Sequence, residues 1–400
     1  MNLSKRHFRE LGSSLKEIFT NHPYAVGESY LEHLFFTIFI AIRSVVAAVI
    51  FLIHGFFPFI LIPKFLNLEG FISWLRKANH NRENKKDMWL YQNVFVNRNK
   101  KDITVHLWDD EIGYKKLTHK TYAYKKSPTG MYRSLYGDKL KKVHYWSEDD
   151  LKQKLMYESD VPIETRVLVD IYPETDDVSK GHKTLVIDIE VEVTDGFPEP
   201  LRADNKITSI AIYDDVMKCY MVFVLSSSKL NYKGDGIIVE SFESEEELLQ
   251  RFYQKYLEIS PTIITGWNTE FFDIPYLYNR TVRVLGQSFS DSLSPIGQVI
   301  YIEHKKKYRI AGVSQLDYLP LYRLFTYTQQ SSYRLDFIGQ LEVGIGKIEY
   351  EGTLNDLYRN DINKFIEYNV NDVKIVVELD KKMKFIDLAR AVAHMGHVPY

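Results

Sequence analysis

Two carboxylates in one short stretch are the residues of this chain best suited to chemistry. Asp188 and Glu190 lie within residues 185–193, where apolar and acidic residues alternate. A period of two predicts a β-strand with one buried face, so both carboxylates project from the same face. Carboxylates that close repel each other unless a cation neutralises them, and hard cations such as Mg²⁺ prefer oxygen ligands. The stretch predicts a metal site on a central strand. The alternative is an edge strand with an acidic, solvated face.

A third acidic position follows a second predicted strand. Residues 261–265 read as a buried strand, and a helix is expected from Asp273 toward Leu285. Asn268 and Asp273 therefore lie at a strand-to-helix junction, where functional groups commonly sit. Taken alone, Asp273 is more often an ordinary helix N-terminal residue.

A fourth acidic position lies on a predicted late helix. Residues 362–379 have a helical pattern that contains Tyr368 and Asp372. Residues four apart share one helix face, so the phenol and the carboxylate are expected to be neighbours. Taken alone, this pair is also typical of a solvated helix face.

Further elements are needed to position these groups. Strands are predicted over 207–214 and 220–225, and an amphipathic helix over 244–259. Nearer the N-terminus, residues 89–96 and 103–108 predict paired strands, and 147–157 a helix with Ser147 as its N-cap. Residues 299–310 predict a hairpin.

The order Asp-x-Glu, Asn-x-x-x-x-Asp, Tyr-x-x-x-Asp is that of the DEDD-type 3′→5′ exonucleases. From about residue 88 to the last residue, the sequence resembles the proofreading region of T4-like phage family B DNA polymerases. Beyond the acidic motifs, the matching segments are 197–200, 265–268, 272–276, 294–297 and 312–318. The resemblance implies an α/β fold with a ribonuclease H-like exonuclease domain.

The resemblance also implies a two-metal hydrolysis of the 3′-terminal phosphodiester. Asp188 would bridge both ions, Glu190 and Asp372 would complete one site, and Asp273 would help to hold the other, largely through water. Tyr368 would orient the attacking water. Two Mg²⁺ or Mn²⁺ ions fit this all-oxygen set better than zinc does. The product would be a nucleoside 5′-monophosphate.

DNA is the partner that the resemblance implies, as a single-stranded 3′ end or a primer-template. Asn268 and Phe272 would line the pocket for the frayed end. Residues 114–142 also carry nine Lys or Arg and one acid with tyrosines interleaved, a pattern suited to single-stranded nucleic acid. Lys125, Lys126 and Arg133 are the candidates there. The alternative is a solvated surface with tyrosines that pack inward.

In the resembling polymerases, a hairpin helps to separate the primer strand from the template strand. The predicted hairpin over 299–310 is shorter than that one, and the alternative is an ordinary surface hairpin.

The composition indicates whether the chain can form disulfides and whether its net charge favours binding to nucleic acid. The chain has 400 residues, a net charge of −2 and one cysteine, Cys219. It can form no intrachain disulfide, and its overall charge does not favour nucleic acid, so local patches or metal ions must hold DNA.

An N-terminal hydrophobic segment stands apart from this region. Residues 44–63 carry no full charge, and twenty such residues can cross a bilayer. A transmembrane helix within 34–63 is expected, which makes the membrane a partner. A re-entrant or interfacial hairpin, because of Gly55 and Pro58, and a buried soluble helix are the alternatives. Residues 1–64 resemble a family of small uncharacterised membrane-type proteins, on residues 22–33 and 54–59.

The expected organisation has five parts: a membrane-type helical segment (1–75), a linker (76–87), a β-rich N-terminal module (88–175), the exonuclease domain (176–385) and the start of a connection to a polymerase domain (386–400). The sequence contains no palm motif, so polymerisation is not expected from this chain alone, and a separate polymerase subunit is the expected partner.

The hypothesis is the proofreading exonuclease portion of a phage replicative polymerase in the host cytoplasm, with membrane association through residues 34–63. Two alternatives remain open. One is a membrane-tethered scaffold whose non-catalytic nuclease domain binds DNA or polymerase. The other is a free-standing repair exonuclease.

Overall fold

The computed structural model describes residues 34, 37–38, 41–42, 45–46, 48–49, 90–98, 103–110, 113–172, 178–194, 196–227, 230, 232, 234 and 236–400. By its contacts the chain divides into two compact units, Met1–Leu90 with Val169–Thr175 and Tyr91–Leu168 with Asp176–Tyr400. The second unit carries all of the predicted catalytic residues.

The predicted membrane-type segment and linker, residues 1–87, lie outside the described residues except for helical positions between Leu34 and Val49. In the part of the chain that the structure describes, no helix combines the length and the apolar character needed to cross a membrane. The predicted transmembrane span within 34–63 is therefore not supported by the described residues.

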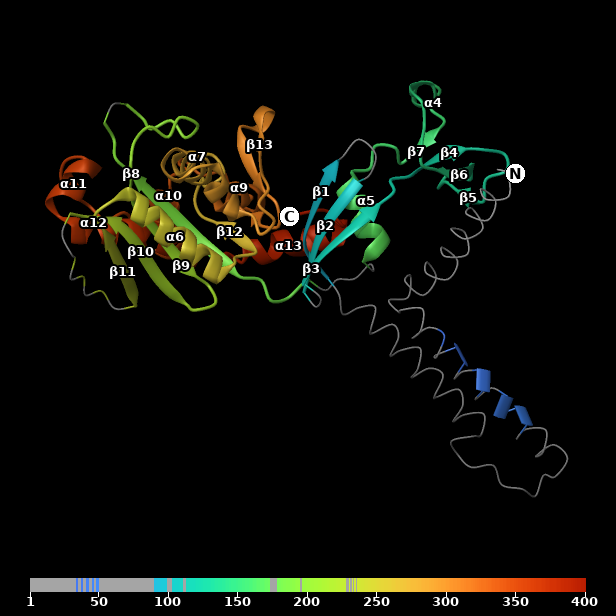
Figure 1. Ribbon diagram of the computed structural model, residues 1–400, viewed down its shortest axis with the longest axis horizontal. Helices are drawn as coiled ribbons and strands as arrows, with labels where there is room; N and C mark the ends of the chain where they lie inside the picture. The colour runs from blue at the N-terminus through green and yellow to red at the C-terminus, as the bar shows by residue number, and fades with distance from the viewer. Residues whose placement is uncertain are drawn as a thin grey trace, which may run out of the picture. The chain divides into compact units, whose positions relative to one another are not determined.

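A six-stranded mixed sheet forms the centre of the second unit (Figure 1). Strand β9 is antiparallel to both neighbours, β8 and β10, whereas β10 with β11, β8 with β12, and β12 with β15 are parallel. The order across the sheet is β11-β10-β9-β8-β12-β15. The strands are β8 (Thr184–Val191), β9 (Ile207–Asp214), β10 (Cys219–Leu225), β11 (Ile237–Phe242), β12 (Ile263–Thr265) and β15 (Ser314–Gln315).

Helices cover both faces of this sheet, which confirms the predicted mixed α/β class. One face packs against α6 (Glu245–Ile259), α7 (Asp273–Leu285), α8 (Gln287–Ser290) and the 3-10 helix η1 (Asp291–Leu293). The other packs against α9 (Tyr318–Phe325), α10 (Leu335–Val343), α11 (Leu354–Asn360), α12 (Ile362–Met383) and α13 (Phe385–Gly396). The predicted helices over 244–259 and 362–379 correspond to α6 and α12.

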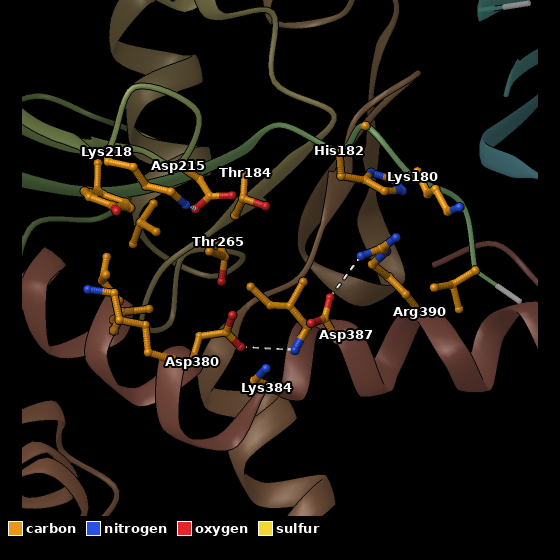
Figure 2. A pocket seen from close by; sticks show the side chains of 18 of the residues that line it. Lys180, His182, Thr184, Asp215, Lys218, Thr265, Asp380, Lys384, Asp387 and Arg390 are labelled. Atoms are coloured by element: carbon orange, nitrogen blue, oxygen red, sulfur yellow. Dashed lines mark hydrogen bonds and ion pairs between the residues drawn. The ribbon is translucent and has the colours of Figure 1, made fainter. Parts of the chain in front are cut away.

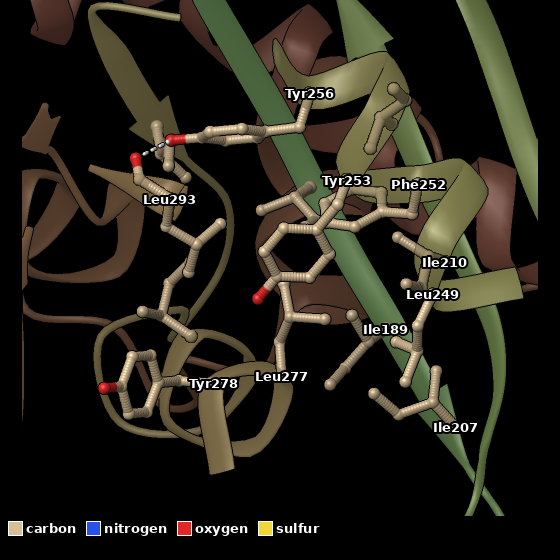
Figure 3. Close-up of a cluster of buried hydrophobic side chains, with 14 of the residues drawn as sticks. Ile189, Ile207, Ile210, Leu249, Phe252, Tyr253, Tyr256, Leu277, Tyr278 and Leu293 are labelled. Carbon is tan, nitrogen blue, oxygen red and sulfur yellow. Dashed lines mark hydrogen bonds between the residues drawn. The ribbon is translucent and has the colours of Figure 1, made fainter. Parts of the chain in front are cut away.

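The core on the α6 face combines branched aliphatic residues of the strands with aromatic residues of the helices (Figure 3). Ile189 and Ile210 of the sheet face Phe252 and Tyr253 of α6. The hydroxyl of Tyr256 donates to the Leu293 carbonyl at 2.8 Å. Ser244 is the N-cap of α6, and its side chain accepts the Glu247 N–H.

Two smaller antiparallel sheets make up the region before the central sheet. The first is β1 (Tyr91–Arg98), β2 (Ile103–Asp109) and β3 (Gly113–His119) in sequence order, which confirms the predicted pair of strands. The second has the order β5-β6-β4-β7. It consists of β4 (Ala123–Lys126), β5 (Tyr132–Arg133), β6 (Lys139–Val143) and β7 (Met156–Tyr157). Helix α5 (Ile163–Ile171) follows it.

The predicted helix from Ser147 to Tyr157 is wrong in its second half. Ser147 and Asp150 form a capping box, but helix α4 (Glu148–Lys152) ends after five residues. Lys154 adopts a left-handed φ of 52°, and Tyr157 then pairs with Tyr124 of β4. Pairing with the sheet overrides the local helical pattern here, since short isolated helices are marginal.

The predicted hairpin at 299–310 is present. It consists of β13 (Val299–Ile302) and β14 (Lys307–Ile310), with the 3-10 helix η2 (Glu303–Lys305) at its tip. Lys307 forms an ion pair with Glu270 at 2.7 Å, which links the hairpin to the loop before α7.

Candidate active site

The alternation along β8 directs Asp188 and Glu190 toward helix α12. Ile187 and Ile189 belong to the core on the α6 face, whereas Val186 belongs to the core on the α12 face. Asp188 and Glu190 continue the register of Val186 because side chains alternate along a strand. Strand β8 pairs with β9 on one side and β12 on the other. The edge-strand alternative is therefore wrong, and the strand is central as predicted.

Helix α12 brings a third carboxylate to the same place. One carboxylate oxygen from each of Asp188, Glu190 and Asp372 lies within 4.8 Å of the other two. All three side chains are partly buried. Like charges gathered this closely favour a cation, and a set of oxygen donors is compatible with a divalent metal ion.

A buried amide fixes the orientation of Asp188. The Asn369 side chain donates from Nδ2 to Asp188 Oδ2 at 2.7 Å, and its Oδ1 accepts from the Ser209 hydroxyl at 2.6 Å. Asn369 and Ser209 are both fully buried. A chain of neutral donors therefore runs from β9 through α12 to the carboxylate, which restricts its rotation.

The fourth predicted acid is tied directly to the backbone of β8. Asp273 is the first residue of α7, and its Oδ1 accepts the Ile189 N–H at 3.0 Å. The preceding loop comes so close to β8 that a Cβ on Gly266 would lie 2.4 Å from the Ile187 carbonyl oxygen. Because Ile189 lies between Asp188 and Glu190, this bond places the Asp273 carboxylate beside the acidic cluster.

A residue that sequence reasoning did not assign holds the loop between β12 and α7. Asp317 accepts the N–H groups of Asn268 at 2.9 Å and Glu270 at 3.0 Å. It also caps α9 by accepting the Leu319 N–H. Asn268 has a left-handed φ of 69°, a conformation that Asn tolerates better than most residues. These bonds determine where the Asn268 side chain lies.

Burial raises the pKa values of all four acids, and repulsion from other carboxylates of the cluster adds to the shifts of Asp188, Glu190 and Asp273. For Asp188 and Glu190, burial is the larger cause and the neighbouring carboxylates the next, so both pKa values lie well above the ordinary range. Burial raises the pKa of Asp273 to about 7 even though the Ile189 N–H opposes the shift. Burial also raises the pKa of Asp372 to about 7. Such shifts are typical of functional sites.

Lys347 is a cation at this site that the sequence did not reveal. Its charge favours the ionised forms of Asp372 and Glu190, lowering both pKa values against the effect of burial. Its Nζ lies 5.2 Å from the centre of the Tyr368 ring and 5.1 Å from that of Tyr350. Burial raises the pKa of the Tyr368 hydroxyl, which is therefore protonated at neutral pH.

A cavity of about 400 Å³ lies beside this cluster and is lined by Asn268, Tyr368, Asp372 and Lys347, with Trp267 and Arg334 among its other walls. The structure thus places Asn268 in the same cavity lining as Asp372. Phe272 does not line this cavity; its ring packs 5.6 Å from that of Phe197 and 5.6 Å from that of Tyr276.

The predicted basic candidates lie in the sheet formed by β4 to β7. Lys125 binds Asp150 at 2.6 Å and Lys126 binds Asp138 at 2.7 Å. Arg133 is exposed on β5 and donates to the Gly137 carbonyl at 3.4 Å. None of these three side chains lines the cavity beside Asp372.

Asn369, Asp317 and Lys347 are the site residues that sequence reasoning missed. Asn369 and Asp317 lie inside segments that carried the family resemblance. The sequence therefore included both residues in the resemblance but did not predict the hydrogen bonds that they form. Lys347 lies in an irregular segment between α10 and α11 and has no recognisable spacing to the acids.

Comparisons with known proteins agree with this geometry. Residues 142–338 match the family described as DNA polymerase family B, exonuclease domain. Residues 16–62 match a family of unknown function (DUF6356).

Curated relatives match the same region. The DNA-directed DNA polymerase of Escherichia phage RB69 is 36% identical over 240 residues, 53% of this chain and 27% of the relative. That of Enterobacteria phage T4 is 34% identical over 245 residues, 54% of this chain and 27% of the relative. DNA polymerase 1 of Saccharolobus solfataricus is 31% identical over 239 residues, 54% of this chain and 25% of the relative.

The chain therefore spans only 25% to 27% of the length of these relatives. Asp188, Glu190 and Asp273 lie within the matched residues 142–338, whereas Tyr368 and Asp372 lie beyond them. Residues 142–338 match the exonuclease domain of DNA polymerase family B, and the region is similar in sequence to part of the phage T4 and RB69 polymerases.

Proposed function

We propose that this chain is a 3′→5′ DNA exonuclease that serves as the proofreading portion of a family B DNA polymerase. The observation that carries this proposal is the convergence of Asp188, Glu190 and Asp372 within 4.8 Å. Asp273 accepts a hydrogen bond from the Ile189 N–H, which lies on β8 between Asp188 and Glu190. Carboxylates brought together from a central strand and a helix are arranged for phosphodiester hydrolysis assisted by divalent metal.

Two Mg²⁺ or Mn²⁺ ions are the proposed cofactor. Asp188 would contact both ions, Glu190 and Asp372 would complete one site, and Asp273 would help to hold the other through water. Bound divalent ions would lower the pKa of the attacking water and neutralise charge on the scissile phosphate.

The neighbouring side chains have complementary roles in this proposal. The Tyr368 hydroxyl, kept protonated by burial, would orient the attacking water. Asn268 would bind the 3′-terminal nucleotide within the cavity beside Asp372. Phe272, beside Phe197, would contact the strand farther from the scissile bond. Lys347 would keep Asp372 ionised and ready for metal.

The sheet order supports a ribonuclease H-like assignment of the domain, with β9 as its antiparallel second strand. We propose the boundaries 88–175 for the β-rich module, 176–385 for the exonuclease domain and 386–400 for the start of a connection to a polymerase domain.

DNA is the proposed substrate, and a polymerase supplied by a second chain is the proposed partner. Arg133 remains a candidate DNA contact because it is exposed. Lys125 and Lys126 would have to exchange their acidic partners for phosphates. The phage relatives support a location in the host cytoplasm. Membrane attachment through residues 34–63 remains a proposal from the sequence.

Degradation of a single-stranded DNA oligonucleotide by the full chain, with and without Mg²⁺ or Mn²⁺, tests this function. We expect metal-dependent degradation that Asp188→Ala abolishes. Asp160→Ala, which removes an exposed carboxylate outside the site, should leave the rate unchanged. A folded protein that degrades no DNA with either metal would refute the catalytic role of this chain.

A further inference from the structure

Lys347 lines the cavity beside Asp372 from a segment that has no regular secondary structure. Residues 344–353, between α10 and α11, form neither helix nor strand. At the start of this segment, Ile345 packs against the core on the α12 face, and its N–H donates to the Gly339 carbonyl at 3.2 Å. Secondary structure therefore does not fix the backbone at Lys347.

A side chain of α12 fixes the backbone beside Lys347 instead. The Asn371 Nδ2 donates to the Gly346 carbonyl at 3.1 Å. Among the described residues, this is the only hydrogen bond that residues 346–352 form. Asn371 directly precedes Asp372 in the chain. The same turn of α12 therefore carries one carboxylate of the acidic cluster and holds the segment that carries Lys347.

The position of the Lys347 ammonium matters for the site. Its Nζ lies 5.1 Å from the centre of the Tyr350 ring and 5.2 Å from that of Tyr368, within the range of cation–π contacts. These two rings meet edge to face, with their centres 5.5 Å apart. A lysine is a point charge on a flexible stem, and its effect on other charges decreases with distance. The effect of Lys347 on the cluster therefore depends on where the backbone at residues 346–347 is held.

We propose that Asn371 is a positioning residue that holds Lys347 beside the acidic cluster. Without the Asn371 amide, the Gly346 carbonyl would lose its donor, and Lys347 would move away from Asp372. Asn371 differs in this from Asn369, which bonds directly to Asp188. The part of Lys347 in catalysis rests on the proposed function, whereas the contact that positions it does not.

Chemical labelling tests the positioning without any reaction on DNA. The full chain and Asn371→Ala would be acetylated with sulfosuccinimidyl acetate in EDTA, and the rate at each lysine would be measured by peptide mass spectrometry. We expect the rate at Lys347 to rise about twofold to tenfold, the range that one hydrogen bond supplies. Lys384, which lies in the separate cavity shown in Figure 2, is the internal reference and should keep its rate. Asn360→Ala, which removes an exposed amide at the end of α11, should change neither rate.

A double-mutant cycle tests whether Asn371 acts through Lys347. In the unsubstituted chain, we expect Asn371→Ala to lower the exonuclease rate about fivefold. In a chain that already carries Lys347→Gln, the same change should have no further effect, because residues that act together are not additive. A purely structural role for Asn371 would lower the rate equally in both chains.

Two results would overturn the inference: an unchanged labelling rate at Lys347 in Asn371→Ala, or an undiminished loss of rate from Asn371→Ala in the Lys347→Gln chain. A folded chain that degrades no DNA would refute the proposed function instead. The labelling experiment would still decide whether Asn371 positions Lys347.

Discussion

At the scale of single residues, the buried acidic cluster destabilises the metal-free protein. Burial raises the pKa values of its carboxylates, and mutual repulsion adds to the shifts of Asp188 and Glu190. Neutral donors hold the carboxylates in place: Asn369 binds Asp188, and the Ile189 N–H binds Asp273. The buried carboxylates thus destabilise the folded protein when no cation is bound, and their arrangement suits a cation.

Asn369→Ala tests whether the buried amide positions Asp188. The change removes the bond to Asp188 and leaves the Ser209 hydroxyl without its acceptor. We expect the Mg²⁺ concentration for half-maximal activity to rise about tenfold, as is typical when a partner of a metal ligand is lost. A metal titration of the nuclease rate measures this. Asn360→Ala, which removes an exposed amide at the end of α11, should leave the metal dependence unchanged. An unchanged metal dependence in Asn369→Ala would mean that the amide is only structural.

Asp372→Asn should separate stability from activity. Removing one charge from the cluster relieves repulsion in the metal-free protein. We expect the free energy of unfolding in EDTA to rise by about 1 kcal/mol, or about 2 °C in melting temperature. Activity should be lost. Thermal unfolding in EDTA is the measurement, with the exposed Asp160→Asn as control. A lower melting temperature would show that the cluster is not under electrostatic stress.

At the scale of elements, two contacts between segments place the four acids together. Strand β8 contacts the start of α7 through the hydrogen bond from the Ile189 N–H to Asp273. It contacts α12 through the hydrogen bond from Asn369 to Asp188. The loop can approach only because position 266 lacks a side chain. A Cβ there would lie 2.4 Å from both the Ile187 carbonyl oxygen and Thr269 Cγ2.

Gly266→Ala should therefore displace the loop that carries Asn268 and Asp273. We expect a loss of about 1–3 kcal/mol in the free energy of unfolding, together with most of the activity. Urea denaturation gives the stability. Gly396→Ala is the matched control, because its Cβ would meet only Val398 at 3.7 Å, an ordinary contact. Equal stabilities of the two variants would contradict the close approach at Gly266.

The same elements show what the sequence could and could not predict. The alternation around Asp188 and the spacing of Tyr368 and Asp372 predicted a strand and a helix, because periodicity is a local property. Their convergence followed only from the family resemblance, since contacts between distant segments leave no local pattern. Lys347 was missed for that reason. Tyr157 was predicted to be helical because its pairing with Tyr124 is invisible in the local sequence.

At the scale of the whole second unit, a buried polar network ties β1 and α13 to the central sheet. The Tyr91 hydroxyl donates to the Ala393 carbonyl, and the Tyr400 hydroxyl to the Tyr91 carbonyl. His182 bonds Thr262 at 2.9 Å, and His394 bonds the Tyr400 hydroxyl at 3.0 Å. Burial, followed by the nearby Arg390 charge, lowers the pKa of His182 to about 3 and that of His394 to about 4.

This network should make stability depend on pH between about 3 and 6.5. Above pH 6.5 both histidines are neutral in the folded and unfolded states. As the pH falls below 6.5, the unfolded chain binds protons that the folded protein excludes, so the free energy of unfolding decreases. The four acids of the cluster, whose pKa values are raised, act in the opposite direction over the same range, so the effect of the histidines is the difference between two variants. We expect urea denaturation to show that His394→Gln loses less stability on acidification than the unsubstituted chain does. His304→Gln, at the exposed hairpin tip, should lose as much stability as the unsubstituted chain. An unchanged slope in His394→Gln would exclude the network as its source.

The direction of degradation tests the central claim most directly. One single-stranded oligonucleotide, labelled at its 5′ end or at its 3′ end, would be incubated with the full chain and Mg²⁺. The account predicts that the 5′ label appears in products that shorten stepwise, and that the 3′ label is released first as a nucleoside 5′-monophosphate. Asp188→Ala should stop both. Internal cleavage, loss of the 5′ label first, or undiminished activity in Asp188→Ala would contradict the account.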